Sequence, residues 1–223
     1  MVVSGEGTIA EVLAGEKRWA VTCADCLDVL PTLADKSVDA VVTDPPYGVG
    51  FAEWDSLCAP ALGEMMRVSE RVAVTPGVRN LFQWPAPAWV ASWSYPAGFK
   101  RSDCGGFNAW EPVLLYGSAS MPLDSRQFPP VASEKIEHDC PKPLAAWTWL
   151  VRSTTEPDHA ILDPFAGSGT TGVAALRLGR RVILIEREPK WADLCRERLR
   201  AEEQGSTLQA RKAGQVAMFG GAK

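Results

Sequence analysis

The stretch DAVVTDPPYGVG, residues 39–50, runs from a short apolar segment into an acid, two prolines and a tyrosine. Residues 40–43 are rich in β-branched side chains, as is typical of a strand buried on both faces of a parallel sheet. Proline cannot donate a hydrogen bond to a neighbouring strand, so we expect this strand to end before Pro45. Ligands of open α/β sheets bind beyond the carboxyl ends of the strands. Asp44, Pro45, Pro46 and Tyr47 are therefore candidates for a functional site.

The rest of the chain alternates between strand and helix patterns. Further strand-like runs lie at residues 19–21, 71–75, 89–93, 113–116, 160–162 and 181–185. Apolar residues spaced three and four apart indicate helices at residues 26–33, 59–68, 144–152, 170–178 and 189–201. Strands that alternate with helices are joined by right-handed crossovers, which makes a sheet mostly parallel. The sequence therefore predicts an α/β, Rossmann-like fold with seven strands in one sheet.

The composition is that of one globular domain. The chain has 223 residues, of which 46% are hydrophobic, and this is enough for one substantial core. We expect the domain at residues 1–203, with an irregular insert at residues 118–137 and a poorly ordered tail at residues 204–223. The sequence shows neither an apolar run of about 18 residues nor a secretory signal pattern, so we expect no membrane partner and a cytoplasmic location. Its scattered cysteines are expected to be reduced.

A second motif, AILDPFAGSGTTGVAALRLGRRVILIERE at residues 160–188, has the pattern of a nucleoside-binding unit. Its first strand ends at Asp163, and a loop with Gly167 and Gly169 leads into a helix. Glycines let a ligand approach the main chain and the helix N-terminus. The second strand ends on Glu186, where an acid can accept hydrogen bonds from ribose hydroxyls. A tight turn followed by a surface glutamate is the alternative, but an acid at this place favours nucleoside binding.

Together, TDPPYG and DPFAGSGTT resemble the motifs of the DNA methyltransferases that methylate amino groups, in the order typical of their β group. Lys142 and Pro143 are similar to the end of the family's H-P-x-Q-K-P segment, whereas Asp139 and Pro141 depart from it. The resemblance covers most of residues 18–200. It implies S-adenosylmethionine as the cofactor, DNA as the partner, and a bacterial or phage restriction-modification role.

The resemblance also implies a circularly permuted arrangement of the family's seven-stranded sheet. The catalytic half would occupy residues 18–117, and the cofactor half residues 138–203. A short target-recognition insert at residues 118–137 would separate them.

The DPPY residues can be given a chemical role in this family. An exocyclic amine on a base is a poor nucleophile because its lone pair is delocalised into the ring. The Asp44 carboxylate and the Pro45 carbonyl can accept the two amino hydrogens and aim the lone pair at a methyl group, with Pro46 keeping that carbonyl rigid. Tyr47 can stack on the base once it is flipped out of the duplex. An Asp before PPY favours the 6-amino group of adenine, and the 4-amino group of cytosine is the alternative.

Cofactor contacts are carried over from the family one residue at a time. Asp25 stands where the family has an acid for the adenine amino group of the cofactor, and a helix cap is its alternative role. Asp163 and Phe165 match the acid and the aromatic residue of the family's cofactor loop. The full predicted set is Asp25, Cys26, Asp44, Lys142, Asp163, Phe165, Gly167, Ser168, Gly169, Thr170 and Glu186.

Other classes of function are weighed on the same residues. Cys23 and Cys26 form a C-x-x-C pair, but a second pair is missing, so we expect no metal. A catalytically inactive nucleoside- or DNA-binding relative would be expected to lack Asp44 or Tyr47, and both are present. Methylation of an RNA base or a protein amide on the same fold is more often served by Asn at the position of Asp44.

The charge and the short insert bear on how DNA is bound. The net charge of −4 argues against wholesale coating of nucleic acid. Residues 118–137 can supply few base contacts, so we expect a short or loosely defined recognition sequence unless a second subunit of a homodimer, or another partner, contributes. The candidate phosphate donors are Lys100, Arg101, Arg126 and Lys135.

Overall fold

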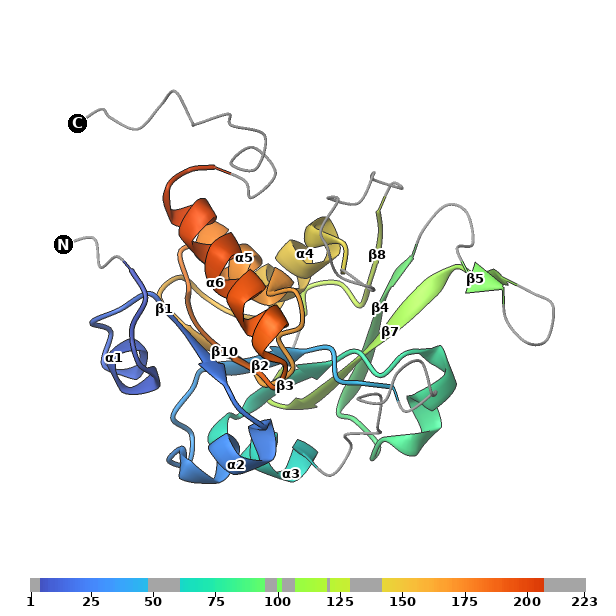
Figure 1. The fold of residues 1–223 in the computed structure, drawn as a ribbon. Coiled ribbons are helices and arrows are strands. Elements are labelled where there is room, and N and C mark those ends of the chain that lie inside the picture. The colour runs from blue at the N-terminus through green and yellow to red at the C-terminus, as the bar shows by residue number, and fades with distance from the viewer. Residues whose placement is uncertain are drawn as a thin grey trace.

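A computed structural model of the chain describes residues 5–47, 61–94, 100–101, 107–119, 121–128 and 142–206. Its main sheet has eight strands in the order β1-β10-β9-β2-β3-β7-β4-β8 (Figure 1). These strands are β1 (Trp19–Cys23), β2 (Ala40–Thr43), β3 (Arg71–Val74), β4 (Trp89–Ser94), β7 (Trp110–Gly117), β8 (Ser125–Gln127), β9 (Ala160–Asp163) and β10 (Arg181–Glu186). The five strands from β1 to β3 in this order are mutually parallel, and β7 is antiparallel to both of its neighbours. The predicted α/β fold with a mostly parallel sheet is confirmed.

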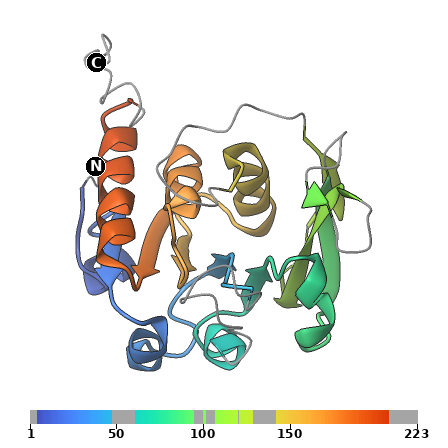
Figure 2. The same ribbon diagram turned by 45° about the vertical axis from the view of Figure 1, so that its right-hand side comes forward.

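Helices cover both faces of the sheet (Figures 1 and 2). One face carries α4 (Leu144–Thr154), α5 (Thr170–Arg177) and α6 (Pro189–Glu203). The other carries α1 (Ile9–Leu13), α2 (Cys26–Val29), the 3-10 helix η1 (Leu30–Thr32) and α3 (Leu62–Val68). Within β2, Val42 packs in the apolar core under α4, α5 and α6, and Val41 packs in the opposite core. Burial on both faces explains why this strand is a continuous apolar run in the sequence.

Four short elements go beyond the pattern predicted from the sequence, and one of them, the 3-10 helix η3 (Val78–Gln83), is described with the site below. Strand β8 lies inside the predicted insert and adds an eighth strand by pairing with β4. Its residues are all exposed, so it has no hydrophobic alternation that the sequence could reveal. Helix α1 has only five residues. The third element is a two-stranded pairing of β5 (Lys100–Arg101) with β6 (Phe107–Asn108).

Candidate active site

The two sequence motifs leave the sheet side by side. β2 pairs in parallel with β9, in a register that matches Val41 with Leu162. The loops that follow Thr43 and Asp163 therefore start from neighbouring strands at the same edge. The Thr43 hydroxyl joins them directly, donating to Asp163 Oδ1 over 2.6 Å. This arrangement places residues 44–47, here called the DPPY loop, next to residues 164–169, here called the glycine loop. The predicted site requires these two loops to be neighbours.

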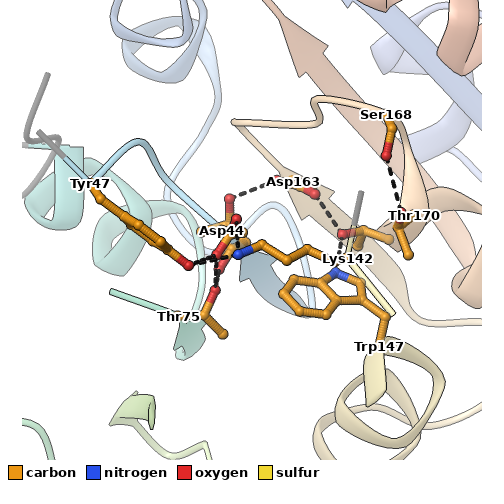
Figure 3. A network of polar contacts seen from close by, with 10 residues as sticks. Asp44, Tyr47, Thr75, Lys142, Trp147, Asp163, Ser168 and Thr170 are labelled. Carbon is orange, nitrogen blue, oxygen red and sulfur yellow. Dashed lines mark hydrogen bonds and ion pairs between the residues drawn. The ribbon is translucent and has the colours of Figure 1, made fainter. Parts of the chain in front are cut away.

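Asp44 is held on both carboxylate oxygens (Figure 3). Oδ1 accepts hydrogen bonds from the Tyr47 hydroxyl, over 2.8 Å, and from the Thr75 hydroxyl. Oδ2 forms an ion pair with Lys142 Nζ at 2.7 Å. The side chains of Lys142 and Asp44 are each 21% exposed, so the pair is largely shielded from water. Hydrogen bonds from three sides fix the orientation of the carboxylate.

Tyr47 and Lys142 complete this network. Lys142 Nζ donates to the Tyr47 hydroxyl over 2.6 Å, and that hydroxyl in turn donates to Asp44. Burial, followed by the negative charge of Asp44, raises the pKa of Tyr47, so the phenol stays neutral. Burial alone would lower the pKa of Lys142, but the charge of Asp44 and the contact with Tyr47 outweigh it and raise the pKa. Lys142 was predicted as a cofactor contact. In the structure its ammonium contacts Asp44 and Tyr47, which are two of the predicted catalytic residues.

The 3-10 helix η3 (Val78–Gln83), which follows β3, supports Tyr47 from a second side. The buried Asn80 donates its amide N–H to the Tyr47 carbonyl. Gly77 has a φ of +71°, and a Cβ at this position would lie 3.0 Å from the Tyr47 ring. Sequence reasoning missed Thr75, Gly77 and Asn80. Their one signal was that they follow the strand next to the DPPY strand.

Asp163 is an internal hub. It is 3% exposed and accepts hydrogen bonds from the hydroxyls of Thr43 and Thr171 and from the Phe165 N–H. The indole of Trp147 on α4 donates to Thr171 over 2.6 Å, so the hub connects β2, β9, α5 and α4 (Figure 3). Burial raises the pKa of Asp163 to about 6. Because three internal donors already use the carboxylate, this side chain organises the loop from inside.

The glycine loop packs closely against helix α6. Gly169 is the N-cap of α5 with a φ of +75°, and a Cβ there would lie 2.9 Å from Cys195 Sγ. Ser168 and Thr170 are buried and bond each other over 3.2 Å. From α6, the guanidinium of Arg198 donates to the Ser168 carbonyl. The predicted loop residues thus form one packed turn whose side chains face inward.

Two acids lie at the ends of the next two strands of the sheet, β10 and β1. Glu186, at the end of β10, accepts from the Gly167 N–H over 2.7 Å and from the Glu188 N–H over 2.9 Å. Burial raises its pKa. Asp25, after β1, accepts from the Leu27 N–H over 2.9 Å and caps α2, the alternative role weighed for it.

Two more of the predicted cofactor contacts, Cys26 and Phe165, pack into the apolar core. Cys26 is buried in the core, and Phe165 packs partly buried against the same core. A carboxylate at the end of β10 beside side-chain-free glycine backbone fits a ribose-bearing cofactor in its chemistry.

Several expectations lie outside the described side chains. These include the phosphate donors Lys100, Arg101 and Lys135 and the segment with Asp139 and Pro141.

Among the described residues, no three His, Cys, Asp or Glu side chains are grouped closely enough to hold a metal ion. Over the same part of the chain, none of the helices has the length and apolar character needed to span a membrane.

Comparison with known proteins identifies the family. A family model described as DNA methylase matches residues 79–197. The type II methyltransferase M2.MboI of Moraxella bovis is 42% identical over 241 residues, which cover 82% of this chain and 88% of that protein.

Solved structures share the fold. The M1.HpyAVI-SAM complex is 23% identical with a TM-score of 0.61, and the match covers 81% of this chain and 100% of that one. The cytosine-N4-specific PvuII DNA methyltransferase is 17% identical with a TM-score of 0.63, over 80% of this chain and 85% of that one.

The matched family uses S-adenosylmethionine, which confirms the predicted cofactor, and its substrate is DNA. The sequence prediction of an amino-methylating DNA methyltransferase is confirmed at this level. The chain belongs to the N6/N4 family of DNA methylases.

Proposed function

We propose that this DNA methyltransferase methylates the 6-amino group of adenine, with Asp44, Pro45, Pro46 and Tyr47 as its catalytic residues. The observation that carries the proposal is the position of the Asp44 carboxylate, fixed by Tyr47 and Thr75 beside the loop that starts at Asp163. An acid before PPY supports adenine over cytosine.

The chemistry follows from the acceptors that the DPPY loop offers. The Asp44 carboxylate and the Pro45 carbonyl accept the two amino hydrogens of the target base, which draws the nitrogen lone pair out of the ring. The neutral Tyr47 ring stacks on the flipped base and repays part of the cost of unstacking. S-adenosylmethionine supplies a methyl group on a positively charged sulfur. The Asp44 carboxylate stabilises the positive charge that develops on the attacking nitrogen.

Cofactor binding is proposed for the other half of the site. Glu186 accepts hydrogen bonds from the ribose hydroxyls, and the main chain of Gly167, Ser168 and Gly169 lies along the cofactor. Asp163 and Thr170 act on the cofactor indirectly, by holding this loop from within. Asp25, Cys26 and Phe165 border the nucleoside end.

Mass spectrometry of the product tests the proposal. Purified protein is incubated with duplex DNA and S-adenosylmethionine, and the DNA is digested to nucleosides. We expect N6-methyladenine, and far less of it after the same incubation time in reactions with an Asp44→Ala variant. N4-methylcytosine in place of N6-methyladenine would assign the second candidate, cytosine. An unmodified digest from a folded, cofactor-binding protein would overturn the assignment of a catalytic DPPY loop.

A further inference from the structure

We infer that Lys142 is a positioning residue that holds the Asp44 carboxylate in the base-free enzyme and is exchanged for the amino group of the target base. The inference rests on the proposed function, because it concerns the same carboxylate. It gives Lys142 a role on the DNA side of the site in place of the predicted contact with the cofactor.

The geometry divides the two oxygens of Asp44 between two kinds of donor. Oδ1 receives the neutral hydroxyls of Tyr47 and Thr75. In the described part of the chain, the contact recorded for Oδ2 is the Lys142 ammonium, at 2.7 Å. An aromatic amine and an ammonium both present N–H groups to a carboxylate oxygen. Oδ2 is therefore the oxygen on which the base can replace the lysine without disturbing the hydroxyl contacts.

Charge gives a reason for the exchange. During methyl transfer, positive charge moves from the sulfonium to the attacking nitrogen, and Asp44 stabilises it best when no other cation neutralises the carboxylate. Before the base arrives, a largely buried Asp44 without a counterion would be costly. Lys142 supplies the counterion before the base binds. It must leave Oδ2 before methyl transfer, so that the full charge of Asp44 faces the attacking nitrogen. The Tyr47 hydroxyl, 2.6 Å from its ammonium, remains a partner after release.

The position of Lys142 suits a side chain that swings while its main chain stays fixed. It lies two residues before α4, whose N-cap is Pro143. Trp147 anchors this helix through Thr171 to Asp163. The four-carbon side chain of Lys142, on an anchored backbone, can swing its ammonium away from Asp44 Oδ2 while it keeps its contact with the Tyr47 hydroxyl.

The test uses Lys142→Met, which removes the charge and keeps the stem, and Lys142→Arg, which keeps the charge. Lys36→Met is the matched control, because Lys36 forms an exposed ion pair with Glu70 away from this network. Each protein is assayed by calorimetry for S-adenosylmethionine binding and by single-turnover methylation of DNA across pH. Thermal melting checks that each variant is folded.

For Lys142→Met we expect cofactor affinity within about threefold of wild type and a methylation rate at least about tenfold lower at neutral pH. Without Lys142, the ionised Asp44 carboxylate would sit in a largely buried site with no counterion, so the acid limb of the pH–rate profile should move to higher pH. Lys142→Arg should keep the wild-type acid limb. The other titratable groups near this network are Tyr47, Asp163 and, through Tyr47, Glu111 on β7; all are common to every variant.

Three results would overturn the inference. An unshifted acid limb in folded Lys142→Met would show that the lysine does not control Asp44. A large loss of cofactor affinity would make Lys142 a cofactor ligand. A shifted limb in Lys142→Arg would show that the charge is not what matters, and this variant decides the question if Lys142→Met does not fold. A wild-type enzyme that methylates neither base would instead reject the proposed function.

Discussion

Asp44 is the residue on which the proposed chemistry depends. It is held by two hydroxyls and one ammonium, so its orientation is set before any substrate binds. A preorganised acceptor costs no reorganisation during the reaction, which is why such groups contribute strongly to rate.

Substitution of Asp44 by Ala should therefore act on the rate of methyl transfer. We expect a loss on the order of 100-fold or more in single-turnover rate, with cofactor binding largely intact, because Glu186 and the glycine loop remain. Radiolabelled methyl transfer and calorimetry measure the two quantities. Comparable turnover by the variant would remove Asp44 from the catalytic role.

Substitution of Glu186 should affect cofactor binding, in contrast to substitution of Asp44, which should affect the rate. Its carboxylate already binds the N–H groups of Gly167 and Glu188, and the proposed ribose contact adds to these. We expect Glu186→Ala to weaken S-adenosylmethionine binding by roughly 1.5–3 kcal/mol, through the lost charge-assisted acceptor and a looser loop. Calorimetry on Glu188→Ala, at the exposed neighbouring position, provides the control. An unchanged dissociation constant for Glu186→Ala would contradict the assignment.

Among the elements, η3 acts as a support for the DPPY loop. Asn80 is buried and is the donor on the Tyr47 carbonyl, and Gln83 Nε2 in turn donates to Asn80 over 2.9 Å.

We expect Asn80→Ala to lower the free energy of unfolding by about 1–3 kcal/mol, since it leaves that carbonyl without its donor. Its methylation rate should fall while cofactor affinity holds. Urea denaturation and single-turnover assays check this. Gln83→Ala, at an exposed position, should change both quantities much less. Equal effects in the two variants would mean that the Tyr47 contact is unimportant.

The hub at Asp163 gives a prediction on pH. Burial raises its pKa from the ordinary 3.8 to about 6, so the folded protein holds this proton more tightly than the unfolded chain. The contribution of Asp163 to stability should therefore be full below about pH 4 and should be lost as pH rises to 6, by on the order of 3 kcal/mol. The free energy of unfolding of wild type and of Asp163→Asn, measured at pH 4.5 and pH 7, gives the pH-dependent contribution of Asp163. Parallel pH dependences would show that Asp163 does not titrate in this window.

How far the sequence predicts these elements depends on the range of the interactions. The strand that ends at Asp44 and the glycine turn at Gly169 were predicted, because their signals are local: β-branched runs, prolines and positive-φ glycines. The contact of Lys142 with the DPPY loop could not be predicted, because Lys142 and Tyr47 are 95 residues apart in the chain and no local pattern links them. Asn80 was missed for the same reason, and β8 because it is an exposed edge strand held by main-chain pairing.

On the scale of the whole molecule, the described part of the insert, residues 118–119 and 121–128, offers little surface for reading a DNA sequence. The net charge is −4, and the described part of the insert is an exposed three-residue edge strand with adjoining turns. Few base contacts imply that phosphate contacts carry the affinity.

We therefore expect DNA affinity that falls steeply with salt and methylation in many sequence contexts. Arg126→Ala, on β8, should reduce the slope of log K against log salt by about 0.9, as for one lost phosphate contact. Arg177→Ala, on α5 and paired with Glu202, is the control. Fluorescence anisotropy over a salt series measures the slopes, and base-resolution mapping of modified DNA measures specificity. A fixed site of about six base pairs or more, methylated by the isolated monomer, would contradict the prediction.

Strands β9 and β10 come from the second half of the chain, yet they lie between β1 and β2 of the first half. A fragment that ends at residue 128 lacks β10, the strand that pairs with β1. A fragment that begins at residue 142 lacks β1 and β2, the strands that pair with β10 and β9. Neither piece can complete the sheet alone, and each supplies the strands that the other lacks. Cutting the chain between these residues should give two inactive fragments that complement each other only when brought together. Fused to two interacting proteins, such a split enzyme would record their encounter as methyl marks on DNA.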